Sequence, residues 1–360
     1  MYLLFSFTLG GTEKLVSSIC NEMSKRNNDV YLYIVNQYYD QEMFDDISPN
    51  MKVILKNREP KFLNIFKAMI DLYKYCKKEN IDVIHCNSFD SPELIFLCKL
   101  FLPKIKIIYT IHNIGSYEKL KKIRVNYRNL FCNSILAISK SVYDEIVRNG
   151  ADKKITKIVY NAIDTKKFQR KSEYELRKEQ IIIGNVARIN LEQKGQDILL
   201  KALNKASEKY NIKCLLAGEP DEAHQKDLLK LKKMADEISS EKLKIVFEGK
   251  VNNVPAFLDK LDIFVLPSRN EGFGISLIEA MEMEVPCVAS KNDGPMELIG
   301  NDERGLLFEK ENTDDLNRCI KKVIEEEDFR NNIVKNAKEY VDNNFNIEKM
   351  CEQLESIYSE

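Results

Sequence analysis

The chain has 360 residues, of which 44% are hydrophobic and 31% charged. This composition excludes disordered and collagen-like proteins, and the length exceeds the roughly 250–300 residues that a single core serves, so two domains are expected. The 55 basic and 56 acidic residues give a net charge of −1, which argues against nucleic acid as a partner. The charge is uneven, because residues 1–164 hold 24 basic and 18 acidic residues, whereas residues 165–360 hold 31 and 38.

The first part of the chain alternates β-rich runs with segments of helical period. Apolar runs predict strands at residues 2–8, 30–35, 81–86, 106–112 and 135–139. Helical patterns lie at about 12–26, 62–78, 92–101, 118–131 and 140–149. This alternation is typical of a parallel sheet covered by helices on both faces. The first run is too short to cross a membrane and lacks a basic leader, so it is expected to be a buried strand rather than a signal peptide.

A charged stretch at residues 165–180 interrupts this pattern, and the same alternation then restarts. The strands expected in the second part lie at residues 180–189, 213–218, 243–249, 262–268, 285–290 and 305–308. Its helices are expected at about 195–209, 225–238, 275–283 and 312–344, and a last amphipathic helix at 347–358. The predicted domains are therefore residues 1–165 and 166–344, with residues 345–360 packing back on the first domain.

Nine cysteines occur without a CxxC pair and without a histidine at zinc spacing. This usage is typical of reduced thiols in a cytosolic protein. No cluster with metal-ligand spacing is present in the sequence, so a metal-independent reaction is favoured and neither a metal nor a cofactor is expected. No run of 18 uncharged apolar residues occurs, so any membrane association is expected to be peripheral.

Two features of the first domain are candidates for a binding site. Gly10 and Gly11 join the first strand to the first helix, where bare amides either attract a phosphate or carboxylate or form an ordinary turn with Thr12 as the N-cap. His112 closes a strand and is expected to donate to a phosphate or to lie beside a reacting carbon. The other two histidines are expected in structural places, His85 in the core and His224 on the surface.

The second domain carries two further candidates at strand ends. Arg188 and Lys194 lie on one strand-to-helix connection, where two cations suit a diphosphate. Glu271 and Glu279 bracket a Gly-x-Gly turn, and if the segment between them were helical their Cα atoms would lie about 12 Å apart. That separation exceeds the roughly 5–9.5 Å of a hydrolase pair. The two carboxylates therefore suit two hydroxyl-bearing rings of a long ligand.

A basic segment at residues 117–128 places five cations among apolar and aromatic residues, which is compatible with contact to anionic lipid. A solvated helix face is the slightly favoured alternative. The five cations are Lys119, Lys121, Lys122, Arg124 and Arg128.

Four motifs taken together resemble the retaining glycosyltransferases of family 4. They are GGTE after the first strand, ARINLEQKGQD with Arg188 and Lys194, EGFGISLIEA with Glu271 and Glu279, and NDGPMELI with Gly294, Pro295 and Glu297. The resemblance spans nearly the whole chain and implies the α/β GT-B fold, with two Rossmann-like doubly wound domains facing each other across a cleft. One departure is Asp293, which stands where the family usually has a small residue.

The resemblance also implies roles for individual residues. Arg188 and Lys194 would hold the diphosphate of a nucleotide-sugar, the Gly11 amide would face it, and His112 would lie near the transferred sugar. Glu271 would bind the sugar hydroxyls and Glu279 the ribose. The donor-binding backbone would comprise Lys250 and Val251 beside the nucleobase and Gly272, Phe273, Gly274 and Ile275 beside the phosphates and sugar.

The activity implied is transfer of a sugar with retention, from a donor that is expected to be a UDP-sugar. The expected acceptor is a glycan or a polyprenyl-linked oligosaccharide of a bacterial surface polysaccharide, and the expected location is the cytoplasm, with an anionic membrane surface as a further partner. Two alternatives stay open at this level: a GT-B sugar-nucleotide epimerase and a non-catalytic sugar-nucleotide-binding protein.

Overall fold

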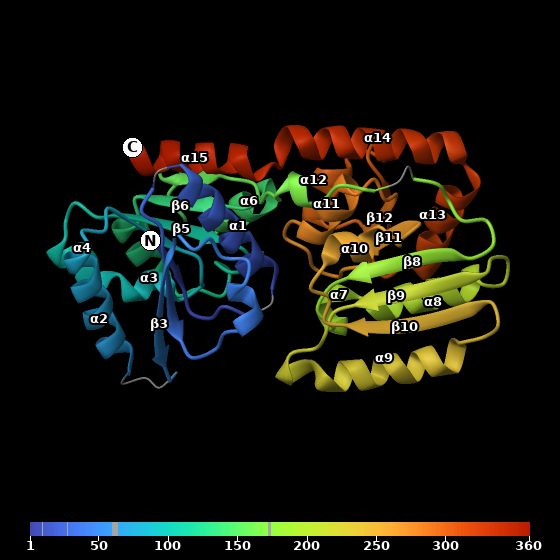
Figure 1. Cartoon of the computed structure of the whole chain (residues 1–360), viewed down its shortest axis with the longest axis horizontal. Helices are drawn as coiled ribbons and strands as arrows, with labels where there is room; N and C mark the ends of the chain where they lie inside the picture. Colours follow the sequence, from blue (N-terminus) through green and yellow to red (C-terminus); the bar gives the residue numbers. More distant parts are fainter. Residues whose placement is uncertain (9, 27, 60–63, 172–173) are drawn as a thin grey trace. The chain divides into compact units, whose positions relative to one another are not determined.

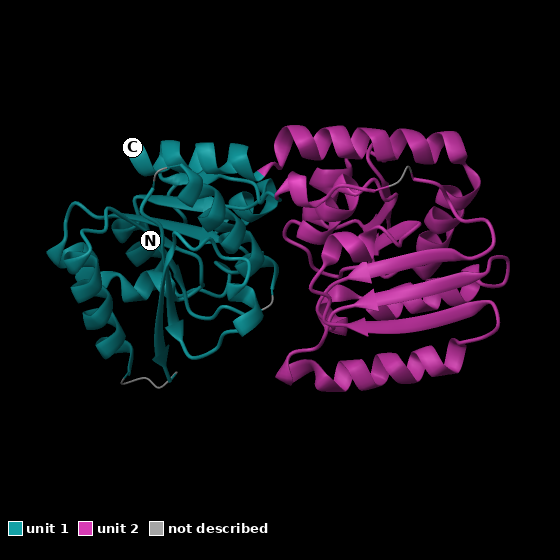
Figure 2. Cartoon of the chain, in the orientation of Figure 1, with its two compact units in different colours: residues 1–163, 347–360 teal, residues 164–346 magenta. Residues whose placement is uncertain are grey.

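The computed structural model describes residues 1–8, 10–26, 28–59, 64–171 and 174–360 (Figure 1). These residues form two compact units (Figure 2). Unit 1 comprises residues 1–163 and 347–360, and unit 2 comprises residues 164–346. The chain therefore leaves unit 1 after Ile163 and returns to it at Ile347, whose amide donates to the Ile163 carbonyl at 2.9 Å.

Unit 1 is built on a seven-stranded parallel sheet in the order β3-β2-β1-β4-β5-β6-β7. Its strands are β1 Tyr2–Leu4, β2 Tyr31–Asn36, β3 Lys52–Arg58, β4 Val83–Cys86, β5 Lys106–Ile111, β6 Ser134–Ala137 and β7 Thr156–Ile158. Its helices are α1 Gly11–Lys25, the 3₁₀ helix η1 Gln41–Phe44, α2 Asn64–Lys78, α3 Ser91–Leu94, α4 Phe96–Phe101, α5 Lys122–Phe131, α6 Lys140–Arg148 and α15 Ile347–Ser359.

Unit 2 repeats the plan with a six-stranded parallel sheet in the order β10-β9-β8-β11-β12-β13. Its strands are β8 Ile181–Val186, β9 Ile212–Ala217, β10 Leu243–Gly249, β11 Ile263–Leu266, β12 Cys287–Ser290 and β13 Leu306–Phe308. Its α-helices are α7 Leu191–Lys194, α8 Gln196–Ala206, α9 Gln225–Ile238, α10 Val254–Leu258, α11 Ile275–Glu282, α12 Asp293–Ile299, α13 Thr313–Glu325 and α14 Glu327–Asn344, with 3₁₀ helices η2 Thr165–Lys167 and η3 Glu222–His224.

The core of unit 2 explains why its strands are apolar on both faces. Alternate strand residues such as Ile183, Cys214 and Val265 join a buried cluster with side chains of α8, α9 and α13. Side chains of intervening positions, such as Phe264, are equally buried but lie outside that cluster. Since successive side chains of a strand point to opposite faces, this sheet is covered on both sides, as the continuous apolar runs predict.

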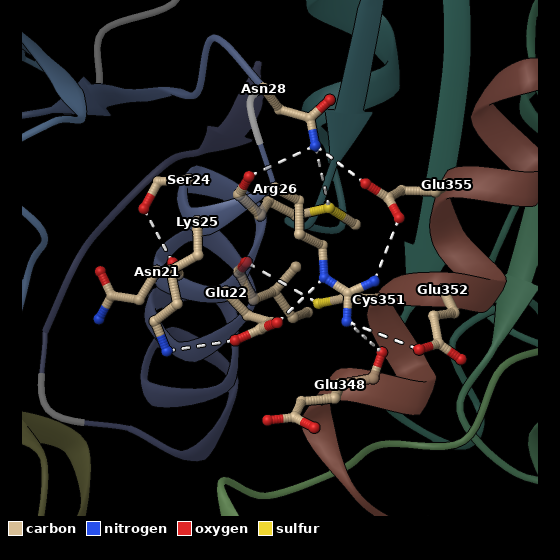
Figure 3. A network of polar contacts seen from close by, with 12 residues as sticks. Asn21, Glu22, Ser24, Lys25, Arg26, Asn28, Glu348, Cys351, Glu352 and Glu355 are labelled. Carbon is tan, nitrogen blue, oxygen red and sulfur yellow. Dashed lines mark hydrogen bonds and ion pairs between the residues drawn. The ribbon is translucent and has the colours of Figure 1, made fainter.

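A polar network fastens the returning helix α15 to α1 in unit 1 (Figure 3). Arg26, which follows α1, donates to Glu22 at 3.0 Å, to Glu355 at 3.2 Å and to the Glu348 carbonyl at 3.0 Å. Asn28 donates to the second oxygen of Glu355 at 3.0 Å. The guanidinium thus bridges a carboxylate of α1 and two turns of α15.

The structure corrects several details at the start of the chain. The first strand ends at Leu4 instead of continuing to residue 8, because the Phe5 amide donates to the Ser88 hydroxyl and Phe7 pairs only through an isolated bridge with Tyr39. The helix α1 begins at Gly11 with Gly10 as its N-cap, so the alternative in which Thr12 is the N-cap is wrong. Residue 9, which precedes the two glycines in the sequence, lies outside the described residues.

Other corrections concern element number and continuity. The helix expected at 92–101 is two helices that meet at Ile95, and the helix expected at 312–344 is interrupted at Glu326. The sequence pattern does not indicate β3, β7, α7, α10 or α12. In β3 the side chains alternate between exposed and half-buried positions, so this edge strand lacks the continuous apolar run that marks the other strands.

The basic segment at 117–128 is also different from the prediction. The helix begins only at Lys122, and Arg128 is completely buried rather than part of a basic face. Arg124 is paired with Asp90 and Glu93. Lys119, Lys121 and Lys122 are exposed, so three of the five cations remain available on the surface.

Candidate active site

The residues predicted to bind the donor in unit 2 come from neighbouring strand ends. Arg188 and Lys194 follow β8, Glu271 follows β11, and Lys250 follows β10. Strand order reverses between β8 and β11, since the chain runs outward from β8 to β10 before it returns to β11. In open parallel sheets such a switch point opens a crevice at the carboxyl ends of the strands, where ligands bind.

Lys194 and Glu271 form an ion pair at this switch point. Lys194 Nζ lies 2.8 Å from Glu271 Oε2, and the two side chains are only 19% and 14% exposed. The Ser268 hydroxyl also lies 3.2 Å from Glu271 Oε2. Lys194 ends the short helix α7, which Asn190 caps by accepting from the Gln193 amide at 2.9 Å. The structure therefore joins two residues that lie 77 positions apart in the sequence.

Arg269 connects the same two loops, although the sequence pattern does not indicate it as a site residue. Its guanidinium makes paired contacts with the Asp197 carboxylate at 2.7 and 3.0 Å, and its amide donates to the Gln193 carbonyl at 2.8 Å. Burial alone would raise the pKa of Asp197, but the hydrogen bonds and charge of Arg269 hold it below its usual value. A bidentate pair of this kind fixes geometry, so Arg269 is a positioning residue for the Lys194–Glu271 pair.

Gly195 and Gly294 permit close packing around this site. A Cβ atom on Gly195 would lie 2.2 Å from the Pro267 carbonyl oxygen, and one on Gly294 would lie 2.6 Å from the Phe273 amide nitrogen. The Gly294 amide also donates to the Glu271 carbonyl at 3.3 Å. Both glycines thus bring backbone against backbone where a side chain would not fit.

Arg188 follows the same strand as Lys194 but has a different partner. Its guanidinium lies 3.3 Å from Asp221 and is 54% exposed. Asp221 also bonds His224, and His224 Nε2 lies 2.9 Å from the side-chain Nδ2 of Asn190. The prediction that His224 is a plain surface residue is therefore wrong, because it is partly buried and links η3 to the loop before α7.

The Gly-x-Gly turn presents backbone rather than side chains. Phe273 is 2% exposed and packs its ring edge-on against Phe345 at 5.4 Å, so its side chain belongs to the core and does not reach into a ligand site. Gly274 has a φ of +107°, a conformation that favours glycine, and α11 begins at Ile275. Glu271 hence precedes the helix, and the 12 Å separation from Glu279 that assumed a continuous helix does not apply.

The remaining donor-site candidates of unit 2 lie on α11 and at the end of β10. Glu279 is half-buried on the second turn of α11. Lys250 and Val251 are half-buried and follow Gly249, whose carbonyl accepts from the Gly218 amide at 2.7 Å. That bond ties the ends of β9 and β10 together, so this turn has a defined position beside the switch point. Gly272 completes the set as a half-buried residue after Glu271.

Gly11 and His112 belong to unit 1, at the carboxyl ends of β1 and β5. His112 Nε2 lies 3.2 Å from Asn87 Oδ1, and Asn87 in turn donates to the His85 carbonyl at 3.0 Å. Burial lowers the pKa of His112 to about 4, so the imidazole is neutral at physiological pH. The hydrogen bonds assign its single proton to Nε2, where Asn87 accepts it. The role of His112 as a donor to a phosphate or as a neighbour of the reacting carbon stays a prediction.

His85 is buried as predicted, and the structure adds its partners. Its two ring nitrogens lie 2.6 Å from the Tyr358 and Thr110 hydroxyls, and it is 2% exposed. Burial is the main reason that its pKa falls to about 3. Because Tyr358 lies on α15, the returning helix completes the core beneath this end of the unit 1 sheet.

Two Rossmann-like parallel sheets of this kind define the GT-B class of glycosyltransferases. Family models agree: residues 166–340 match Glycosyl transferases group 1, and residues 9–167 match Glycosyltransferase Family 4. The two matches together span residues 9–340. The chain thus belongs to the family 4, group 1 glycosyltransferases and is a transferase.

Individual relatives are distant but cover nearly the full chain. The N-acetyl-alpha-D-glucosaminyl L-malate synthase of Bacillus anthracis is 24% identical over 98% of this chain and 94% of its own length. The capsular polysaccharide biosynthesis glycosyltransferase CapM of Staphylococcus aureus is 27% identical over 94% and 91%. Among solved structures, HepE of Anabaena in complex with UDP and glucose matches with a TM-score of 0.84 and 20% identity, over 100% of this chain and 98% of that one.

Proposed function

We propose that this protein transfers a sugar from a UDP-sugar to a hydroxyl of a glycan or lipid-linked acceptor, with retention of anomeric configuration. The observation that carries the proposal is the Lys194–Glu271 pair at the switch point of unit 2, 2.8 Å apart and next to the Gly272–Gly274 turn that leads into α11. A cation and backbone amides suit a diphosphate, while a neighbouring carboxylate suits sugar hydroxyls.

In the proposed reaction the bond between the sugar and the diphosphate breaks, and the acceptor oxygen bonds to the same carbon on the same face. The departing phosphate oxygen takes the acceptor proton, so no protein nucleophile is required. Lys194 stabilises the negative charge that develops on the diphosphate, and Arg188 on the same connection assists it. Because these cations supply positive charge, we also propose that the reaction needs neither metal ion nor cofactor.

The choice of UDP and of the pathway rests on the relatives. HepE was crystallised with UDP and glucose, and CapM is described as a capsular polysaccharide biosynthesis enzyme. We extend both properties to this chain as part of the proposal: a UDP-linked donor, and a cytoplasmic role in the synthesis of capsule, exopolysaccharide or another surface polysaccharide.

We further propose that the enzyme works at an anionic membrane surface through unit 1. In the described residues no helix is long and apolar enough to cross a membrane. Apolar side chains are nevertheless exposed on three helices that ring contacts connect: Tyr73 of α2 with Phe101 of α4, and Phe96 of α4 with Phe131 of α5. The exposed apolar face comprises Phe66, Ile70, Phe96, Leu100, Phe101, Ile123 and Leu130, each between 37% and 76% exposed. Together with Lys119, Lys121 and Lys122, it has the composition of an interfacial surface.

A thermal-shift panel of UDP-, GDP-, ADP- and dTDP-sugars, with magnesium and with EDTA, tests the donor assignment. A ligand at 100 times its dissociation constant stabilises the folded protein by about 2.7 kcal/mol, which shifts the unfolding midpoint by several degrees. A shift confined to UDP compounds and insensitive to EDTA is expected. No shift with any nucleotide would contradict the proposal.

The transfer step needs its own assay. Incubation of the identified donor with acceptor should give a new glycosidic bond whose anomeric configuration, read by NMR, equals that of the donor. A transfer product with the opposite anomeric configuration would instead identify an inverting enzyme. Epimerisation of the donor without acceptor would identify an epimerase. Binding with release of intact donor would identify a binding protein.

A further inference from the structure

An exposed aromatic ring stands at the carboxyl edge of the unit 1 sheet. Phe89 lies in the connection between β4, which ends at Cys86, and α3, which begins at Ser91. Its side chain is 40% exposed. A phenylalanine so close to the end of a buried strand would ordinarily be expected to pack into the core. Phe89 follows Asn87, the partner of His112, by two residues.

A fully buried arginine holds the backbone of Phe89. Arg128 of α5 has no exposed surface and donates to the Phe89 carbonyl at 2.7 Å, and the Tyr109 hydroxyl donates to the same carbonyl at 3.2 Å. Burying a guanidinium is costly, and Glu93 at 3.4 Å is its carboxylate partner. Among the described residues, Nε and Nη1 of Arg128 have no hydrogen-bond partner. The fold therefore buries the Arg128 guanidinium, at a cost in desolvation free energy, directly against the loop that carries Phe89.

The same arginine also contacts the Phe89 ring. Its guanidinium carbon lies 4.9 Å from the centroid of that ring, and that of Arg124 lies 5.7 Å away. Arg124 bonds Asp90 and Glu93, on either side of the start of α3. Both the main chain and the ring of Phe89 are thus fixed against α5, while part of the ring stays open to solvent.

We propose that Phe89 is a stacking platform for a sugar ring of the acceptor, a role that rests on the proposed transferase function. The flat face of an aromatic ring suits the C–H face of a pyranose. A ring that is already fixed loses little conformational freedom when a ligand binds. The neighbouring carboxylates of Asp90 and Glu93, 52% and 28% exposed, suit sugar hydroxyls. Such polar surroundings favour a glycan over a lipid chain at this position.

Substitution of the ring separates stacking from simple apolar contact. With an acceptor found by product formation, Phe89→Leu and Phe89→Ala should raise the acceptor KM by about 2- to 10-fold, as expected for the loss of one aromatic contact. Phe89→Tyr should leave it unchanged. Donor binding and donor hydrolysis without acceptor should be unaffected in all three variants, and Leu229→Ala, at an exposed apolar position of unit 2, is the control. An unchanged acceptor KM in Phe89→Leu would overturn the stacking role.

A binding assay keeps the platform testable even if no donor binds. The chain contains no tryptophan, so Phe89→Trp introduces a single tryptophan at the site, which can be excited selectively over the tyrosines. Titration with the methyl glycosides of glucose, galactose and N-acetylglucosamine should give a saturable emission change with at least one of them. Absence of a saturable change with all three would overturn the platform. If instead no nucleotide-sugar binds while the emission change occurs, the transferase proposal fails and the sugar site stands.

Discussion

Lys194 and Glu271 are each other's partner at the switch point of unit 2, with 2.8 Å between Nζ and Oε2. In the absence of ligand the pair neutralises two charges that are each mostly buried. A diphosphate would draw the lysine and leave the carboxylate to sugar hydroxyls. If Lys194 and Glu271 hold the donor as proposed, the pair keeps these two donor-binding groups in a neutral form before the ligand arrives.

Replacement of Lys194 should weaken donor binding strongly. Lys194→Ala removes charge-assisted contacts worth about 1.5–3 kcal/mol, which corresponds to roughly 10- to 150-fold in donor Kd or kcat/KM. Isothermal titration with UDP and steady-state kinetics measure the two effects. Because the substitution also leaves Glu271 unpaired, the double variant Lys194→Ala/Glu271→Gln separates the loss of charge from damage to the pair. A fully active single variant would refute the diphosphate role.

The two glutamates should differ in their response to free UDP. Glu279→Ala should weaken UDP and UDP-sugar by a similar factor, about 10-fold or more, because ribose is common to both. Glu271→Ala should weaken only the UDP-sugar, since it removes a sugar contact and releases Lys194 for the diphosphate. Titration of each variant with both ligands decides the matter. The opposite pattern would mean that the two roles are exchanged.

The sequence predicts this site because its residues follow strands, and parallel strands bring their carboxyl ends to one edge. The sequence does not indicate Arg269, because its partner Asp197 lies 72 residues away and no local pattern relates the two. The same long-range contact is what allows Arg269 to hold two loops together. From the sequence, Arg128 is expected on an exposed basic face, because helical spacing shows which residues share a side of one helix but not what packs against that side. The aromatic rings of Tyr109 and Tyr117 that enclose Arg128 come from β5 and the loop after it. Packing between distant segments, rather than local propensity, decides both positions.

Arg26 should contribute more to the attachment of α15 than its neighbour Lys25. Arg26→Met removes hydrogen bonds to Glu22, Glu355 and the Glu348 carbonyl, at a cost of about 1.5–3 kcal/mol, because these contacts join charged groups that are partly buried. Lys25 also contacts Glu22, at 3.2 Å, but is 69% exposed, so Lys25→Met should cost less than about 1 kcal/mol. Hydrogen exchange of the α15 amides measures both. Equal protection in the two variants would contradict a clamp at Arg26.

The buried histidines of unit 1 should make the protein less stable in acid. Burial lowers the pKa of His85 to about 3 and that of His112 to about 4, against 6.5 in the unfolded chain. Between these values the unfolded chain binds more protons, so the contribution of the two histidines to stability is constant above about pH 7 and falls as the pH decreases. The slope is up to about 1.4 kcal/mol per pH unit for each histidine.

His85→Gln isolates one of these two contributions. Glutamine can hydrogen-bond the Tyr358 and Thr110 hydroxyls but does not titrate. Urea unfolding at pH 7, 6 and 5 should show a smaller loss of stability in the variant than in the original chain, and a fixed difference at all three pH values would show that His85 is not the titrating group.

The exposed apolar face of unit 1 should determine binding to vesicles. Ile123 and Leu130 are each 76% exposed on α5, so serine at both positions should leave the fold intact. Burial of such side chains in an interface contributes about 1.5–3 kcal/mol each, so the double variant should lose at least 10-fold in affinity for vesicles that contain phosphatidylglycerol. Leu229→Ser is the matched control, because Leu229 is 68% exposed on α9 of unit 2.

Glutamate at Lys119, Lys121 and Lys122 should weaken the same binding to vesicles and reduce its dependence on salt, since each lysine near an anionic surface contributes about 1 kcal/mol. If the control variant and the α5 variant sediment equally with vesicles, or if salt has no effect on the original chain, this face does not bind the membrane.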